Sequence, residues 1–207
     1  MSVVLPLLYP ITDTYLSGLS HTEQVRRMIA GGAKLIQLRE KRASPEEFYR
    51  DAEKALQIAH NEGVKIIIND RVDIALALKA DGVHLGQDDL PPGEARKLLG
   101  NKAIIGFSTH NRQQAVAAVD FSVDYIAIGP IFATNSKENP DPVVGLEQLA
   151  LIRKALQEFP LVAIGGITEL NFRALFAIGV DSMAVINFIL SDPNKISERV
   201  KLFTENN

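Results

Sequence analysis

Residues 66–89, IIINDRVDIALALKADGVHLGQDD, contain the pattern that decides the fold. Two short apolar runs, 66–68 and 82–85, each stop at a polar tip, and the segment between them has the periodicity of a helix. This order predicts two consecutive strands joined by one helix. Because such a crossover makes the strands parallel, their polar tips are expected at the same end of the sheet.

The same alternation runs along the rest of the chain. The predicted strands are apolar runs rich in β-branched residues: 5–11, 33–38, 65–68, 82–85, 103–107, 125–128, 161–164 and 182–186. They lack the alternation typical of an open antiparallel sheet, as expected of parallel strands covered by helices. Eight βα units predict an α/β fold, a (β/α)8 TIM barrel, as a single catalytic domain over residues 1–207. A doubly wound open sheet is the alternative, but no GxGxxG follows the first strand.

Local signals place the helices between these strands. Residues 44–63 begin with Ser44 as N-cap, Pro45 at the first helical position and Glu47 completing a capping box, and they stop at Gly63. A further helix is expected to begin at Thr168, after a pair of glycines.

Composition limits the classes of function. The net charge is −3 with no basic stripe or polybasic run, so neither nucleic acid nor a membrane surface is an expected partner. Cysteine is absent, which excludes thiolate chemistry. We find no signal-peptide pattern and no window of 18 apolar residues, and we therefore expect a cytoplasmic protein acting on small molecules. The oligomeric state has no signature in the sequence.

In barrels of this type the active site lies at the carboxyl ends of the strands. The second strand ends in IQLREK, and alternate residues place Gln37, Arg39 and Lys41 on one face. Arginine and lysine there suit a phosphate. The alternative is a solvated turn in which one of the two cations pairs with Glu40.

Carboxylates follow the next two strands. Asn69 and Asp70 end one strand, and Asp88 and Asp89 follow the other. Mg²⁺ typically takes one or two carboxylates together with phosphate oxygens, so these acids could form a metal site. The alternative is that Asp70 caps the helix after it and that Asp88 or Asp89 caps the next one.

Later strand ends add hydroxyls, a cation and backbone amides. Ser108 could bind a phosphate oxygen or instead cap the next helix, and Thr134, Ser136 and Lys137 lie in a long loop that suits an oxyanion. Gly166 belongs to a glycine pair that lets backbone amides approach a phosphate. At the last strand end, Ile186 and Asn187 could complete that second anion site.

The positions of the four histidines argue against acyl transfer through a catalytic triad. His21 and His60 lie near predicted helix ends and are expected at the surface, whereas His84 is expected to be a satisfied core residue. His110 is expected in a turn, and none is paired with an obvious nucleophile.

Taken in order, QLREK, INDR, GVHLGQDD, GFSTH, GPIFATNSK and AIGGI resemble the thiamine phosphate synthase family over nearly the whole chain. The resemblance implies that 4-amino-2-methyl-5-(diphosphooxymethyl)pyrimidine is joined to 4-methyl-5-(2-phosphooxyethyl)thiazole, giving thiamine phosphate and pyrophosphate. It implies Mg²⁺ as cofactor and ionisation of the pyrimidine substrate before the thiazole nitrogen attacks. The alternatives are a related thiazole tautomerase on the same barrel and a non-catalytic phosphate-binding barrel.

The resemblance also implies a role for each motif residue. Catalysis would fall to Arg39, Lys41, Ser108 and Lys137, and Mg²⁺ to Asp70 and Asp89. The pyrimidine diphosphate would be bound by Gln37, Arg39, Glu40, Lys41, Asn69, Ser108 and Lys137, and the thiazole phosphate by Thr134, Ser136, Gly166, Ile186 and Asn187. Asn187 stands where the family is expected to have serine, and Arg71 where it often has a second acid.

Overall fold

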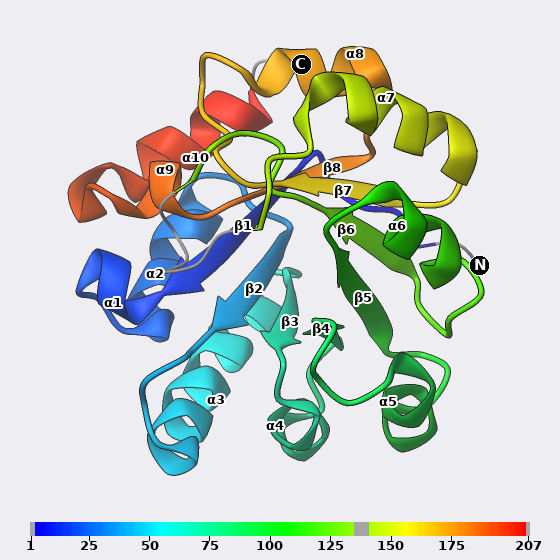
Figure 1. Ribbon diagram of the computed structural model, residues 1–207. Coiled ribbons are helices and arrows are strands. Elements are labelled where there is room, and N and C mark those ends of the chain that lie inside the picture. Colours follow the sequence, from blue (N-terminus) through cyan, green and yellow to red (C-terminus); the bar gives the residue numbers. More distant parts are fainter. Residues whose placement is uncertain (1–2, 135–140, 206–207) are drawn as a thin grey trace.

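A computed structural model describes residues 3–134 and 141–205 and contains a closed parallel barrel (Figure 1). Its strands are β1 (Leu8–Asp13), β2 (Leu35–Arg39), β3 (Lys65–Asn69), β4 (Gly82–Leu85), β5 (Ile104–Thr109), β6 (Tyr125–Ile128), β7 (Leu161–Ile164) and β8 (Ser182–Val185). Each strand pairs with the next, and β8 closes the ring on β1. The predicted (β/α)8 barrel is confirmed, and the open-sheet alternative is wrong.

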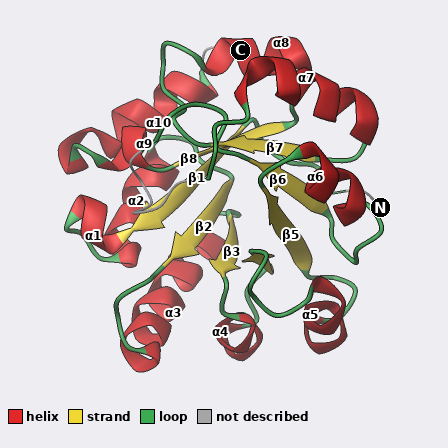
Figure 2. Ribbon diagram, viewed as in Figure 1, coloured by secondary structure: helices red, strands yellow, loops and turns green. Residues whose placement is uncertain are grey.

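Helices surround the strands on the outside of the barrel (Figure 2). They are α1 (Thr14–Ser17), α2 (His21–Ala30), α3 (Pro45–Asn61), α4 (Val72–Leu78), α5 (Pro92–Leu99), α6 (Arg112–Ala118), α7 (Gly145–Leu156), α8 (Phe172–Ile178), α9 (Asn187–Leu190) and α10 (Ile196–Thr204), with a 3-10 turn at Pro193–Lys195. Among the described helices, none has the length and apolar character needed to cross a membrane.

The long apolar runs arise because both faces of each strand are buried. On β3, Ile67 points into the barrel beside Tyr9 and Leu35, whereas Ile66 and Ile68 pack under the outer helices. All three isoleucines are completely buried. A strand buried on both faces reads as a continuous hydrophobic run, which is what made these strands visible in the sequence.

The first strand begins later than expected. The sequence placed it at 5–11, but β1 runs from Leu8 to Asp13. Val3 and Leu5 pack against the hydrophobic cluster inside the barrel without belonging to the strand, so hydrophobicity alone extended the predicted strand too far back. At its other end, the buried Asp13 continues the strand and its carboxylate accepts hydrogen bonds from the first turn of α1.

Helix boundaries show one success and one error. In α3, Ser44 and Glu47 form the expected capping box, and the helix ends at Asn61. The helix expected at Thr168 begins instead at Phe172. Residues 168–171 form a separate turn, because the Asn171 side chain accepts a hydrogen bond from the Thr168 amide at 2.9 Å.

Candidate functional site

A cavity of about 970 Å³ opens at the carboxyl ends of the strands, within the size range of small-molecule sites. Its lining includes most of the predicted site residues: Gln37, Arg39, Lys41, Asn69, Asp70, Asp89, Ser108, Thr134, Gly166, Ile186 and Asn187. Ser136 and Lys137 lie outside the described residues. The structure therefore brings together side chains from β2 to β5 and from the β6, β7 and β8 ends in one space.

The two cations at the end of β2 are held by carboxylates from neighbouring strands. Arg39 donates to Asp13, and the Lys41 ammonium donates to Asp70 Oδ2 at 2.5 Å. The alternative in which either cation pairs with Glu40 is wrong. An arginine and a lysine fixed at the same end of the barrel suit a diphosphate, because its oxygens can accept hydrogen bonds from both cations.

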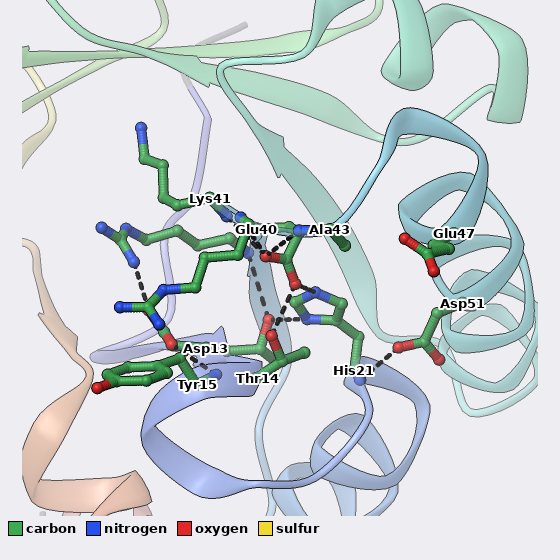
Figure 3. Close-up of polar contacts among 12 residues, drawn as sticks. Asp13, Thr14, Tyr15, His21, Glu40, Lys41, Ala43, Glu47 and Asp51 are labelled. Carbon is green, nitrogen blue, oxygen red and sulfur yellow. Dashed lines mark hydrogen bonds and ion pairs between the residues drawn. The ribbon is translucent and has the colours of Figure 1, made fainter.

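Glu40 lies between these cations in sequence, but its carboxylate is turned away from them. Figure 3 shows it directed toward His21 and Thr14, while the Lys41 side chain points the other way. The Glu40 side chain is only 6% exposed. The Glu40 side chain is therefore not part of the cavity lining, because its own loop and the β1–α1 junction occupy both oxygens. Its expected substrate contact stays a prediction.

The carboxylates of Asp70 and Asp89 face each other across the ends of β3 and β4. Asp70 adopts a left-handed φ of 61°, and its amide donates to the His84 carbonyl at 2.8 Å, which ties the two strand ends together. Asp89 Oδ2 accepts from the Gly86 amide at 2.7 Å. Burial, together with the charge of Asp70, raises the pKa of Asp89 above its ordinary value.

These acids do not serve as helix caps. Helix α4 begins after Arg71 and α5 after Pro91, and neither helix has a side-chain cap. The capping alternative is therefore wrong for Asp70, Asp88 and Asp89.

The pair fits a hard cation. Two carboxylates so close that the charge of Asp70 helps to raise the pKa of Asp89 give the oxygen ligands that Mg²⁺ takes from a protein when phosphates supply the rest. Within residues 3–134 and 141–205, no group of three or more acids or histidines could hold a metal by itself. A metal at this place would take its remaining ligands from phosphate oxygens or water.

A buried chain of hydrogen bonds forms the floor of the cavity. The Gln37 amide donates to the Tyr9 hydroxyl at 2.9 Å, which lies 3.0 Å from the Tyr125 hydroxyl. Tyr125 lies 3.0 Å from His84 Nδ1, and His84 Nε2 lies 2.8 Å from Ser108 Oγ. The chain joins five strands and ends at two predicted site residues, Gln37 and Ser108.

The tyrosines of this floor stay uncharged. Burial raises the pKa of both Tyr9 and Tyr125, so they act only as hydrogen-bonding groups. Sequence reasoning missed both, although a hydroxyl inside an aliphatic strand signals a buried polar partner. His84 is buried and hydrogen-bonded, as expected, and it also lines the cavity.

Ser108 contributes a hydroxyl to the cavity and does not cap a helix. Helix α6 is capped by Asn111, whose side chain accepts from the Gln114 amide at 2.9 Å. The side-chain amide of Gln87 donates from Nε2 to the Ser108 carbonyl at 2.5 Å and fixes the backbone at this strand end.

The glycine pair at the end of β7 has a packing role as well as space for a ligand. Gly165 and Gly166 have φ values of 101° and 67°. A Cβ on Gly166 would lie 2.5 Å from the Ala133 carbonyl oxygen, so only glycine lets the loop after β6 pack here. The expected helix start beside the glycines is absent, since α8 begins at Phe172, while α9 begins at Asn187 directly after β8.

Two histidines differ in exposure. His60 is half-exposed and pairs with Asp81, as expected for a surface residue. His21 is only 1% exposed, and the surface prediction for it is wrong. Its ring packs 5.2 Å from that of Phe48 and meets the Thr12 hydroxyl at 2.7 Å, so polar partners from other elements make its burial possible.

Fold and site together define a class of protein: a (β/α)8 barrel with a strand-end pocket suited to phosphorylated small molecules. The family model described as thiamine monophosphate synthase matches residues 8–189. The chain belongs to this family.

Individual relatives agree with that assignment. The chain is 46% identical to a thiamine-phosphate synthase of Koribacter versatilis over 196 residues, covering 92% of each protein. It is 43% identical to the Syntrophomonas wolfei thiamine-phosphate synthase, covering 94% of this chain and 93% of the relative. The solved structure of a thiamine phosphate pyrophosphorylase from Pyrococcus furiosus superposes with a TM-score of 0.86 at 34% identity, covering 96% of this chain and 94% of that one.

Proposed function

We propose that this chain is a transferase that joins the pyrimidine diphosphate to the thiazole phosphate and releases thiamine phosphate and pyrophosphate. The observation that carries the proposal is the division of one cavity into two unlike sides. Arg39, Lys41, Asp70 and Asp89 lie at the ends of β2 to β4, whereas Gly166 lies at the end of β7, across the closed ring. Such a site suits two phosphorylated ligands held face to face.

The diphosphate belongs on the cationic side. Arg39 and Lys41 would bind its oxygens together with the Ser108 hydroxyl, and Lys137 is proposed to join them from the loop after β6. Asp70 and Asp89 would hold Mg²⁺, which supplies positive charge to the departing pyrophosphate. Opposite charges 4 Å apart are worth about 4 kcal/mol at an effective dielectric near 20, so several contacts of this kind stabilise a leaving group strongly.

The organic parts of the substrates belong over the cavity floor and its far side. Gln37 and Asn69 would position the pyrimidine ring above the buried tyrosines. We propose that Thr134 and Ser136 bind the thiazole substrate and that Gly166, Ile186 and Asn187 bind its phosphate. Asn187 can still donate a hydrogen bond to a phosphate in place of the expected serine.

The residues of the site match the chemical demands of this reaction. A carbon–oxygen bond to the diphosphate breaks, and the same carbon bonds to the thiazole nitrogen, which carries no proton. No strong general base is required, and the floor offers neutral hydroxyls and an imidazole that is already hydrogen-bonded on both sides. Catalysis would rest on positioning and on charge stabilisation.

Product analysis tests this proposal and separates it from its alternatives. Purified protein is incubated with both substrates and Mg²⁺, and the products are separated by chromatography. We expect thiamine phosphate and pyrophosphate only when both substrates are present. Isomerisation of a thiazole phosphate without the pyrimidine would indicate a tautomerase, and ligand binding without any product would indicate a binding barrel.

The cytoplasmic location expected from the sequence stays a prediction.

A further inference from the structure

Glu40 organises the loop that presents the two cations to the cavity. Its Oε1 accepts from three successive backbone amides: Lys41 at 2.8 Å, Arg42 at 2.7 Å and Ala43 at 3.1 Å. The loop between β2 and α3 therefore wraps around this one carboxylate oxygen, and Lys41 belongs to the wrapped segment.

The other oxygen of Glu40 is anchored to the preceding βα unit. Oε2 accepts from the Thr14 hydroxyl at 2.7 Å and lies 3.3 Å from His21 Nε2 (Figure 3). His21 is fixed in turn, because its amide donates to Asp51 Oδ2 at 2.6 Å and its Nδ1 meets the Thr12 hydroxyl. Glu40 is thus held by residues of α1 and α2 and, through Asp51, by α3.

These contacts keep Glu40 ionised. Burial alone would raise its pKa, but hydrogen bonds from the Thr14 hydroxyl and from the amides of Arg42 and Ala43 lower the pKa from 4.5 to about 2. A permanent negative charge strengthens each of the hydrogen bonds that it accepts.

The same two loops are joined a second time beside the cavity. Asp13, next to Thr14, accepts from the amides of Tyr15 and Leu16 and pairs with Arg39. Asp13 and Arg39 are directly paired in the register of β1 and β2. The contacts of Arg39 and Glu40 therefore hold the β1–α1 junction and the β2–α3 loop together at two neighbouring points.

We infer that Glu40 is a positioning residue, which holds the backbone of residues 40–43 so that Arg39 and Lys41 meet the diphosphate, and that it does not touch the substrate. This inference rests on the proposed function for the identity of the ligand. Inorganic pyrophosphate contains the part of that ligand which the two cations would bind, and it is therefore a suitable probe.

The sign of the effect distinguishes positioning from simple electrostatics. Removing a negative charge near an anion site should strengthen anion binding through the general field. A positioning role predicts weaker anion binding, because a loop without the Glu40 hydrogen bonds no longer holds both cations in the geometry that the anion needs.

The affinity of wild-type protein and variants for inorganic pyrophosphate with Mg²⁺ is measured by isothermal titration calorimetry. We expect Glu40→Gln to bind pyrophosphate about tenfold more weakly, the order of loss found when a hydrogen-bond partner that orients a metal-binding side chain is changed. Glu47→Gln is the matched control: it neutralises a carboxylate of the adjacent capping box and should leave the affinity unchanged. Thr14→Val keeps the charge of Glu40 but removes one donor, and it should weaken binding in the same direction.

A double-mutant cycle tests whether Glu40 acts through the cation. In a Lys41→Ala background, Glu40→Gln should change pyrophosphate affinity by less than about twofold, because coupled residues are not additive. If Glu40→Gln cannot be purified folded, Thr14→Val is carried through the same cycle.

Several results would overturn the inference. Unchanged or tighter pyrophosphate binding by Glu40→Gln and Thr14→Val would do so, as would wild-type protein that binds no pyrophosphate. If Glu40→Gln weakened binding of the complete pyrimidine diphosphate but not of pyrophosphate, Glu40 would contact the substrate directly, and the inference would be wrong. If wild-type protein forms no thiamine phosphate while Glu40→Gln still weakens pyrophosphate binding, the proposed function fails and the positioning role stands.

Discussion

Gly166→Ala is expected to destabilise the chain and to damage one half of the site. At this position φ is 67°, and an added Cβ would meet the Ala133 carbonyl oxygen at 2.5 Å and Phe132 Cβ at 2.7 Å. A left-handed φ costs an L-residue about 1–2 kcal/mol. Overpacking a tight contact costs about 1–3 kcal/mol more, which gives a total of about 2–5 kcal/mol.

Gly63→Ala is a closely matched control for the backbone part of this cost. Gly63 follows α3 with the same φ of 67°, but nothing lies within 4 Å of its added Cβ. Gly63→Ala should therefore cost only about 1–2 kcal/mol. Unfolding in urea, followed by circular dichroism, gives the free energy of unfolding of both variants and of wild-type protein.

The two variants should also differ in activity. Gly166→Ala pushes the loop after β6 away from the end of β7, so we expect a higher KM for the thiazole phosphate and a nearly unchanged KM for the pyrimidine diphosphate. Gly63 lies at the opposite end of the βα unit from the cavity lining, and its variant should keep both values. Equal destabilisation by the two substitutions would refute the close contact at Gly166, and an unchanged thiazole KM would refute its place in the phosphate site.

Three further predictions address the metal, the floor and pH. Asp89→Ala should lose most of its activity while its melting temperature stays within a few degrees of wild type, since the residue lies in a loop; normal turnover would remove it from the metal site. Tyr125→Phe should cost about 1–3 kcal/mol of stability, because Tyr9 and His84 Nδ1 each lose the buried hydrogen bond that they make with the Tyr125 hydroxyl, and an unchanged urea midpoint would contradict this. For Glu40, a pKa lowered from 4.5 to about 2 means that its stabilising effect is complete above pH 4.5 and is lost as the pH falls toward 2. The difference in unfolding free energy between wild type and Glu40→Gln should accordingly shrink over that range, and a difference that stays constant would contradict the pKa.

The barrel could be predicted because its signal is local. The apolar runs at 82–85, 125–128 and 161–164 coincide with β4, β6 and β7, since strands buried on both faces are hydrophobic without interruption. Once the strands were placed, the fold itself put their carboxyl ends at one face, and Arg39 and Asp89 entered the same cavity as expected.

The residues that sequence reasoning missed depend on contacts between distant segments. The Tyr9 and Tyr125 hydroxyls meet across 116 positions of sequence, and no local pattern reports such a pair. His21 looked like a surface residue at a helix start, but partners from β1 and the β2–α3 loop satisfy its ring in the interior. Glu40 lies in the motif between two predicted ligands, Arg39 and Lys41. The direction of its side chain nevertheless depends on hydrogen bonds from the backbone amides that follow it.

Formation of thiamine phosphate is the most direct test of the central claim. The initial rate is measured with both substrates, first with Mg²⁺ and then with excess chelator, and pyrophosphate release is followed in the same samples. We predict equal amounts of the two products with Mg²⁺ and a loss of both with chelator. No thiamine phosphate under either condition would contradict the proposed reaction, and full activity in chelator would contradict the metal assignment of Asp70 and Asp89.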